Sequence, residues 1–510
     1  MQPSKRSFYT FTKSNSLGSG TESKSKQPDP FDYILPLTAN KPIFYTNGNN
    51  IRVISTPSEF YETLKDNIRD AKRRIVLSTL YIGSTETELI ETIESSLKQN
   101  PDLEVIFLFD SLRGTRKERS GNSTASLVYG LVEKFGCERV KAYLYHTPDL
   151  SGIKKKVYPA RINETIGVQH IKAYVTDDKT IISGANLSRD YFTNRQDRYF
   201  MFSECSELSN YLEDLVVSIS KFSYQLEKKT KFQKRKKDLE INYELVLKKE
   251  CPNPHRSPLA FRKYSNGIMK KFLQDWKSIV DKEFSSQNLC NSSTKDTFII
   301  PTIQMGPLGI YQDQEHTETL FEIMNNLASK YGQFYSDITS AYFNFADLHK
   351  NAILKSDALF NILIASPQAN GFFGARGMSK YIPFAYTMFE LDFLKQLVIR
   401  GREDKVQVYE YNKLGWTYHG KGIWCGFERC NPHLTVIGSS NLGERSLKRD
   451  LEAQFTIVTQ NKTVQNELKS ELKRLYEHST RVTRETIEGD ASRKVPSWVR
   501  LVEPIIKTKM

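Results

Sequence analysis

The chain has 510 residues, 39% of them hydrophobic, which suffices for the cores of two or three domains and argues against wholesale disorder. Its formal net charge of +14 at pH 7 favours anionic partners, namely nucleic acid, acidic membrane surfaces or phosphorylated small molecules. Six irregularly spaced cysteines indicate a reducing compartment, and no apolar run reaches the roughly 18 residues of a spanning helix, so we expect only peripheral membrane contact.

Residues 1–30 are expected to be disordered. The first twenty contain Lys5, Arg6, Lys13 and five serines, and no acid precedes Glu22. This basic, serine-rich composition is typical of a mitochondrial presequence, although a flexible cytosolic tail fits the same residues.

Residues 31–225 are predicted to form a first lobe. The stretch 58–83 has the pattern of an amphipathic helix followed by a strand, and 85–110 predicts a second helix, a proline-containing loop and a buried strand. Helices that alternate with apolar strands indicate an α/β fold in which a mostly parallel sheet is flanked by helices.

Residues 296–510 are predicted to form a second, similar lobe. The segments 332–344 and 358–367 take the places that 71–83 and 103–111 have in the first lobe. Ser111 and Ser366 lie 255 positions apart, as do Asn186 and Asn441. Such a recurring offset indicates internal duplication, so we expect two pseudo-symmetric lobes.

Between the lobes, residues 226–295 form a basic segment. Seven basic residues stand between Lys228 and Lys237, and three prolines from Cys251 to Pro258 argue against a compact helix there. The segment fits a solvated linker. The alternative is contact with anionic lipid, to which each basic residue near the surface contributes about 1 kcal/mol.

Two segments share a His-x-Lys pattern, a returning strand and a closing Gly-Ser/Ala-x-Asn. The residues are His170, Lys172 and Asn186 in the first copy, and His419, Lys421 and Asn441 in the second. On a strand, side chains two positions apart share one face, so each pair projects into one space. One imidazole can then attack phosphorus while the other moves the proton, and lysine and asparagine hold the charged oxygens. Such a site needs neither metal nor cofactor.

Two acids are expected to support these histidines. Asp197 and Glu452 each follow the closing Asn by 11 residues, so we expect each to orient the imidazole of its own lobe. Asp177 follows Lys172 by five residues, whereas the second copy has Gly426 at that place. Because the aspartate comes at the turn after the strand, we expect it to support the hairpin, and the second copy to keep its chemistry without it.

The string "HIKAYVTDDKTIISGAN" fits the His-x-Lys-x4-Asp-x6-Gly pattern and resembles the phospholipase D superfamily. The resemblance implies two phospholipase D-like lobes with the active site between them. It implies His170 as nucleophile and His419 as general acid/base, with the reverse assignment open. The implied catalytic set is His170, Lys172, Asp177, His419 and Lys421, with Asn186, Asn441, Asp197 and Glu452 in support.

Four longer strings are similar to the eukaryotic CDP-diacylglycerol–glycerol-3-phosphate 3-phosphatidyltransferases. They are "NETIGVQHIKAYV", "LSRDYFTNRQDRY", "LFDSLRGTR" and "GERSLKRDLEAQF". The similarity implies a phosphatidyltransferase that makes phosphatidylglycerophosphate and CMP from CDP-diacylglycerol and sn-glycerol 3-phosphate, toward phosphatidylglycerol and cardiolipin. It implies a phosphohistidine-type intermediate, contact with an anionic membrane, no nucleic acid, and a place at the matrix face of the mitochondrial inner membrane.

Two further stretches have open interpretations. A strand-to-helix turn offers amides that can hold a nucleotide phosphate, or is an ordinary turn. Its residues are Ser78, Thr79, Leu80, Tyr81, Ile82, Gly83, Ser84 and Thr85. The glycine-rich stretch from Gly371 to Tyr381 fits either a loop over the headgroup or nucleotide, or a plain surface loop.

The motifs alone do not identify the acceptor. A phospholipase D-type phosphatidylserine synthase, a phospholipase D-like phosphodiesterase or nuclease, and a catalytically degenerate lipid-binding scaffold are alternatives at this stage. The glycine in place of the second motif aspartate is the feature that favours the scaffold.

Overall fold

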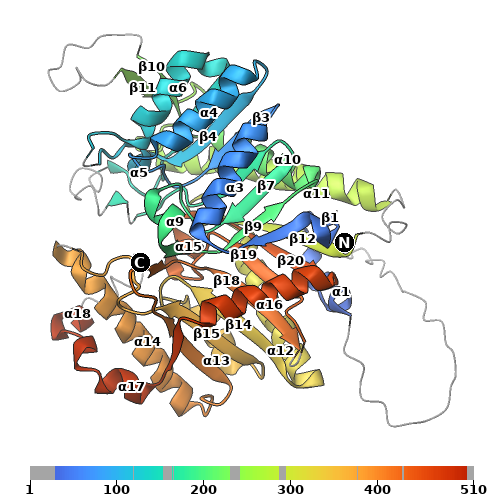
Figure 1. Cartoon of the computed structure of the whole chain (residues 1–510), viewed down its shortest axis with the longest axis vertical. Coiled ribbons are helices and arrows are strands. Elements are labelled where there is room, and N and C mark those ends of the chain that lie inside the picture. The colour runs from blue at the N-terminus through green and yellow to red at the C-terminus, as the bar shows by residue number, and fades with distance from the viewer. Residues whose placement is uncertain are drawn as a thin grey trace, which may run out of the picture.

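A computed structural model describes residues 29–118, 120–152, 163–164, 166–229, 242–285, 295–375, 377–427 and 430–501. Nearly all of the expected presequence and most of the basic run after Lys228 lie outside these residues. The chain forms two lobes, each built on one large sheet (Figure 1). The expected two-lobed α/β fold is confirmed.

The first lobe contains a nine-stranded sheet. Across the sheet, its strands are β11 (Tyr243–Val246), β10 (Tyr224–Lys228), β5 (Val140–Tyr145), β4 (Glu104–Asp110), β3 (Arg74–Ser78), β6 (Ala173–Thr176), β7 (Lys179–Ser183), β9 (Tyr199–Phe202) and β2 (Ile51–Ile54). Its helices are α3 (Pro57–Asp70), α4 (Thr87–Gln99), α5 (Ser111–Thr115), α6 (Thr124–Arg139), α9 (Arg189–Thr193), α10 (Ser206–Ser220) and α11 (Pro258–Ser285).

The second lobe contains a ten-stranded sheet. Its strands are β1 (Phe44–Thr46), β12 (Thr297–Met305), β20 (Leu451–Thr459), β19 (Leu434–Gly438), β18 (Gly422–Phe427), β14 (Phe334–Ser340), β15 (Leu359–Ala365), β16 (Val406–Tyr411) and β21 (Ser479–Val482), with β13 (Ile310–Tyr311) beside β12. Its helices are α1 (Pro30–Tyr33), α2 (Leu35–Thr38), α12 (Gln312–Tyr331), α13 (Asp347–Lys355), α14 (Ile382–Ile399), α15 (Glu444–Lys448), α16 (Lys462–Tyr476), α17 (Arg484–Gly489) and α18 (Ser497–Leu501).

The sheets are mixed and not mostly parallel as expected. Within each, one trio of strands is parallel: β3, β4 and β5 in the first lobe, and β14, β15 and β16 in the second. The motif hairpins β6–β7 and β18–β19 join the edge of each trio in the antiparallel direction. A two-residue turn can connect only antiparallel strands, so a hairpin adds antiparallel pairs to a parallel centre.

Two lobe boundaries differ from the expectation. Strand β1 pairs with β12, and α2 packs on α12, so the segment from Pro30 to Thr46 belongs to the second lobe. The segment 226–295 was expected to separate the lobes. Part of it instead completes the first sheet as β10 and β11, and α11 packs on α10.

The local sequence explains the helices that cover the outer faces. Helix α3 starts with Pro57 at its first turn, and the Thr56 hydroxyl accepts a hydrogen bond from the Glu59 amide. Phe60, Leu64 and Ile68 follow at intervals of four and are fully buried against the sheet. Helices α12, α13 and α14 cover the outer face of the second sheet in the same way.

The inner faces of both sheets share one core. Strand β6 shows the alternation, because Ala173 and Val175 face this core while Tyr174 faces the outer helices. Ala453 and Phe455 of β20 contribute to the same core from the second sheet. Helices α10, α11 and α16 complete it, so hydrophobic burial holds the lobes together.

Arg198, next to β9, also joins the lobes and was not anticipated. Its side chain is fully buried, pairs with Glu471 at 2.9 Å, and lies 3.6 Å over the Trp424 ring. It also donates to the Val436 carbonyl. Gly422 has a φ of +139°, and a Cβ there would collide with the guanidinium, so this glycine makes room for the arginine.

Within the described chain, no helix combines the length and apolarity needed to cross a membrane.

Arg198→Ala should lower the free energy of unfolding by about 3–5 kcal/mol, because it leaves the Glu471 carboxylate buried without its cation. Thermal unfolding monitored by circular dichroism measures the effect as a lower midpoint. Arg69→Ala is the matched control, because Arg69 is 51% exposed and pairs with Asp66 at the surface, where loss costs at most about 1 kcal/mol. Equal midpoints for the two variants would contradict this role of Arg198.

Candidate active site

The two motif histidines lie where the lobes meet. The His170 amide donates to the Leu451 carbonyl at 2.9 Å, so the segment before β6 runs alongside β20 of the other lobe. The His419 amide donates to the Gln196 carbonyl at 2.7 Å, next to the pair formed by β8 (Arg195–Gln196) and β17 (Thr417–Tyr418). Main-chain bonds between the lobes therefore fix the start of both motifs.

The expected carboxylates do hold the imidazoles, but crosswise between lobes. His170 Nδ1 lies 3.0 Å from both carboxylate oxygens of Glu452, and His419 Nδ1 lies 2.7 Å from Asp197 Oδ2. The expectation that each acid serves its own lobe is wrong. Each closing segment turns back toward the seam, where the nearest imidazole belongs to the partner lobe. In both cases a carboxylate that accepts the Nδ1 proton leaves Nε2 as the unprotonated nitrogen. Lys421 Nζ lies 2.8 Å from Nδ1 and 3.3 Å from Nε2 of His419.

Both motif lysines point into the same buried centre. Lys172 Nζ donates to the His170 carbonyl and Lys421 Nζ to the His419 carbonyl, each at 2.7 Å. Both side chains are almost completely buried. The sequence-predicted pairs are thus brought together in one place, as the spacing of two residues required.

Burial dominates the electrostatics of this centre. It lowers the pKa of His170 and of His419 well below the usual value, and the neighbouring lysines add to the effect. Burial also raises the pKa of Asp197 to about 6 and raises that of Glu452. It lowers the pKa of Lys421 to about 8, partly opposed by Asp197 and Glu452. At neutral pH the imidazoles are therefore neutral, as a nucleophile and a base must be.

Asn186, the closing asparagine of the first motif, is linked to His419 through Tyr191. Asn186 donates through Nδ2 to the Tyr191 hydroxyl at 3.2 Å, and that hydroxyl lies 3.2 Å from His419 Nε2. In the described part of the chain, Asn186 Oδ1 and Asn441 Oδ1 are buried without a hydrogen-bond partner. Turning such an amide over exchanges its donor and acceptor atoms, so each can present an NH₂ group to an anion.

Asp177 lies away from this centre. Its carboxylate accepts hydrogen bonds from the amides of Lys72, Arg73 and Arg74, at 2.8 to 3.1 Å. Seven positions of near-extended chain separate it from His170, which is on the order of 20 Å. It fastens the hairpin turn to the start of β3. Its place in the catalytic set is therefore corrected to a supporting one.

Gly426 takes the place of that aspartate because a tyrosine occupies the space. Gly426 pairs with Tyr335 across β18 and β14, and a Cβ at Gly426 would stand 3.0 Å from the Tyr335 hydroxyl oxygen. That hydroxyl donates to the Cys430 carbonyl at 3.2 Å and so holds the loop after β18. A phenol from the neighbouring strand thus anchors the second hairpin.

The turn from Ser78 to Thr85 has few amides to offer to a nucleotide. The Thr79 amide donates to Leu108, the Gly83 amide to Leu187, and the Ile82 amide to the Thr124 hydroxyl. The Ser78 hydroxyl receives Gln169 Nε2 at 2.6 Å and so positions the residue before His170. This geometry is that of an ordinary strand-to-helix turn.

Several residues at this seam were missed by the sequence analysis. Asp450 accepts from the Val168 amide at 2.9 Å, and Asp110 from the Gln169 amide at 3.2 Å, so two buried carboxylates hold the main chain before His170. Burial raises the pKa of Asp110 to about 7. Their signal in sequence was weak, because single acids near strand ends are common.

In the described chain, one group of side chains is close enough together to hold a metal ion: ligand atoms of His170, Asp450 and Glu452 lie within 4.8 Å of one another. Its oxygens are already engaged, since Asp450 also binds Arg445 at 2.9 Å and Glu452 accepts from Ser446 at 3.0 Å. The buried lysines place positive charge in the same centre, which suits an anionic ligand better than a cation.

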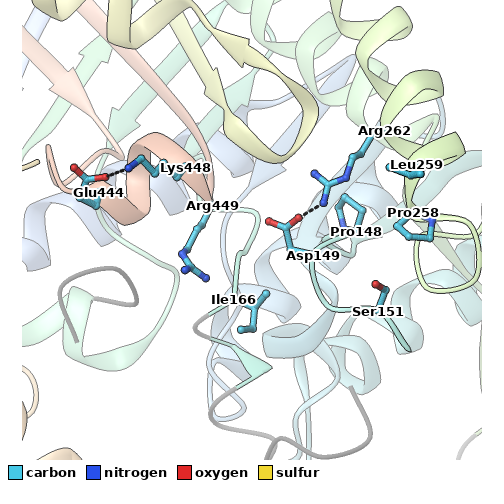
Figure 2. A pocket seen from close by; sticks show the side chains of 10 residues that line it. All are labelled: Pro148, Asp149, Ser151, Ile166, Pro258, Leu259, Arg262, Glu444, Lys448 and Arg449. Carbon is cyan, nitrogen blue, oxygen red and sulfur yellow. Dashed lines mark hydrogen bonds and ion pairs between the residues drawn. The ribbon is translucent and has the colours of Figure 1, made fainter. Parts of the chain in front are cut away.

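A pocket of about 460 Å³ opens beside the seam (Figure 2). Ile166 and Arg449, a few residues before His170 and Glu452, line it together with Leu259 at the start of α11. Its acids pair with bases, Asp149 with Arg262 and Glu444 with Lys448. Figure 2 shows Arg449 between these pairs, extending toward Ile166. The pocket therefore combines apolar walls with one open guanidinium.

Two imidazoles with matched carboxylates and lysines, at the seam of two pseudo-symmetric lobes, define a phospholipase D-like enzyme of phosphoryl transfer. Comparison with protein-family models finds no match. The chain is 38% identical to a probable CDP-diacylglycerol–glycerol-3-phosphate 3-phosphatidyltransferase of Dictyostelium discoideum, over 92% of this chain and 79% of that one. It is 39% identical to the mitochondrial enzyme of that name from Gallus gallus and 36% to that of Homo sapiens, each over 91% of this chain and 84% of the relative. The chain belongs to this phosphatidyltransferase family.

A solved structure agrees with the fold. Phosphatidylserine synthase of Haemophilus influenzae Rd KW20 superposes with a TM-score of 0.66, covering 94% of this chain and all of that one. The sequences are 17% identical, so the likeness concerns the two-lobed fold.

The pH dependence of catalysis should reflect Lys421. Its ammonium form is present below its pKa of about 8 and is lost as pH rises through that value, so kcat/KM should fall above pH about 8. Bound phosphate favours the ammonium form, so kcat at saturation should fall at higher pH. Steady-state rates between pH 6 and 10 measure both profiles. A kcat/KM that stays level up to pH 10 would contradict this assignment.

Proposed function

We propose that this chain transfers the phosphatidyl group of CDP-diacylglycerol to sn-glycerol 3-phosphate, giving phosphatidylglycerophosphate and CMP. Membership of the family supports these substrates. The observation that carries the chemistry is the crosswise pairing of His170 with Glu452 and His419 with Asp197, which leaves both Nε2 atoms able to react.

In the first step, His170 Nε2 attacks the phosphorus that carries diacylglycerol. The bond from that phosphorus to the CMP oxygen breaks, and CMP leaves with the electron pair. The proton stays on His170 Nδ1, hydrogen-bonded to Glu452, and the negative charge of that carboxylate stabilises the phosphorylated imidazolium. CMP is a phosphate monoester with a second pKa near 6, so it leaves with little acid assistance.

In the second step, His419 acts as a base. The low pKa of this histidine keeps Nε2 unprotonated, and the hydroxyl of glycerol 3-phosphate takes the place of the Tyr191 hydroxyl there. Nε2 accepts the hydroxyl proton while the oxygen bonds to phosphorus. The bond between phosphorus and His170 breaks, and its electron pair returns to the imidazole.

Lys172, Lys421 and the two asparagine amides supply positive charge and donors to the phosphoryl oxygens. Bound anions raise the pKa of the lysines and keep them protonated through the reaction. Asp177 and Tyr335 hold the two hairpins, so they act on the geometry of the histidines and not on phosphorus. The missing second aspartate is therefore consistent with an active enzyme.

The assay follows CMP and lipid product from purified protein, CDP-diacylglycerol and glycerol 3-phosphate. His170→Ala should abolish both the transfer and the exchange of labelled CMP into CDP-diacylglycerol, because no covalent intermediate forms. His419→Ala should lower transfer about 10²–10⁴-fold and exchange much less, since only the acceptor needs the base. A labelled enzyme intermediate in His170→Ala but not in His419→Ala would reverse the two roles. Product with serine alone would refute the acceptor.

The protein is further proposed to lie against the matrix face of the mitochondrial inner membrane. Helix α11 supports this contact, because Leu259 at its start is 80% exposed and Lys263 and Lys270 are exposed along it. Each such lysine near an anionic surface contributes about 1 kcal/mol. The relatives named as mitochondrial support the compartment. Detection of the protein outside mitochondria by cell fractionation would contradict it.

Leu259→Asp should weaken co-sedimentation with cardiolipin-containing vesicles, because it replaces an inserting apolar side chain by an anion. Leu414→Asp is the matched control: Leu414 is 99% exposed in the loop between β16 and β17 of the second lobe. Equal binding of the two variants would show that α11 is not the membrane contact.

A further inference from the structure

The two halves of the site differ in charge at equivalent positions. Four and nine residues after the closing Asn, the first lobe has Asp190 and Arg195, whereas the second has Arg445 and Asp450. Asp190 pairs with Arg195 at 3.3 Å, and Arg445 pairs with Asp450 at 2.9 Å. The order of charges is reversed, so the pseudo-symmetry of the site is broken here.

In the ion pair beside His419, the charge of Arg195 is compensated less by its partner than the charge of Arg445 is in the other pair. Asp190 is 63% exposed, so water screens its charge, whereas the carboxylate of Asp450 is buried beside Arg445. The Arg195 guanidinium itself is only 17% exposed. A largely buried guanidinium whose carboxylate partner is exposed to water attracts an anion. Of the two equivalent ion pairs, only the one beside His419 contains such a guanidinium.

The strand β8 places Arg195 next to the proposed base. Arg195 and Asp197 are two positions apart, and Asp197 holds His419 Nδ1. The guanidinium lies 4.7 Å from the centre of the Tyr191 ring, and the Tyr191 hydroxyl lies 3.2 Å from His419 Nε2. Arg195 Nε donates to the Thr417 hydroxyl at 3.0 Å, which anchors the side chain across β17.

Two further groups converge on the same cation. A Cβ built on Gly371 would lie 3.5 Å from Arg195 Nη2 and 3.6 Å from the Tyr342 hydroxyl oxygen. The Tyr342 ring centre is 6.3 Å from that of His419. Gly371, the first residue of the glycine-rich stretch, thus lies over a guanidinium and a phenol at the edge of the reacting centre.

We propose that Arg195 and Tyr342, beneath Gly371, form the subsite for the phosphate of the acceptor, and so select a phosphorylated alcohol over a neutral one. The inference rests on the proposed function, in which the acceptor hydroxyl meets His419. A phosphate takes hydrogen bonds from guanidinium and phenol while the far hydroxyl of the same molecule reaches Nε2. An acceptor without phosphate makes no such bond to the Arg195 guanidinium.

The test compares glycerol 3-phosphate with glycerol as acceptors for the wild type and Arg195→Gln. The ratio of their kcat/KM values should fall about 10- to 100-fold in the variant, because the lost charge-assisted bond serves only the phosphorylated acceptor. Tyr342→Phe should lower the ratio less, and Gly371→Leu should raise KM for glycerol 3-phosphate by filling the space. Arg484→Gln, which removes an exposed arginine paired with Glu488 on α17, should leave the ratio unchanged.

Exchange of labelled CMP into CDP-diacylglycerol distinguishes a failure of the proposed function from a failure of the proposed subsite. If the wild type shows neither exchange nor transfer, the proposed function fails and this subsite fails with it. If exchange persists in Arg195→Gln and the ratio stays within twofold of the wild type, the function stands and the subsite is refuted. If exchange falls while the ratio holds, Arg195 serves CMP and the proposal is equally refuted. A thermal midpoint equal to the wild type shows that the variant folds.

Discussion

The crosswise carboxylate–imidazole bonds are the constraint on which the site depends. Glu452 of the second lobe holds His170 of the first, and Asp197 of the first holds His419 of the second. Neither lobe alone contains a correctly held histidine. The shared core of the inner sheet faces and the buried Arg198 are therefore part of the catalytic apparatus, because any shift of one lobe moves both imidazoles from their partners.

The same arrangement solves an electrostatic problem. Two lysines and two carboxylates are buried together, and an unpaired charge in such a place costs several kcal/mol. The carboxylates Asp197 and Glu452 oppose the lowering of the pKa of both lysines by burial, so the opposite charges of the site compensate one another. Arg195 departs from this balance, because its partner Asp190 stands in water. The departure lies on the side where we propose that the phosphate of the acceptor binds.

Short-range patterns in the sequence predicted the motif hairpins, the alternation of helices with buried strands and the convergence of two His-Lys pairs, because these depend on a period of two residues and on local apolar runs. Pairings between distant strands were not predictable. Nothing near Gly426 indicates that Tyr335, from another strand, fills its space, and nothing near Glu452 shows which lobe it faces. The assignment of β1 to the second sheet and the fit of Arg198 beside Gly422 depend likewise on tertiary contacts. The antiparallel strands outside the motif hairpins were missed because the alternation of helices and strands describes only the centre of each sheet.

The pairing of β1 with β12 has a consequence for the order of folding. Phe44 lies opposite Ile299, more than 250 positions along the chain, so the start of the chain must stay unpaired while the whole first lobe is synthesised. Such distant pairing is slow to form and leaves an exposed strand in the meantime. Proteolytic processing before Pro30 removes none of these contacts. A cut after Thr46 would remove β1, an edge strand of the second lobe, although the strand β12 that pairs with it lies far along the sequence from the cut.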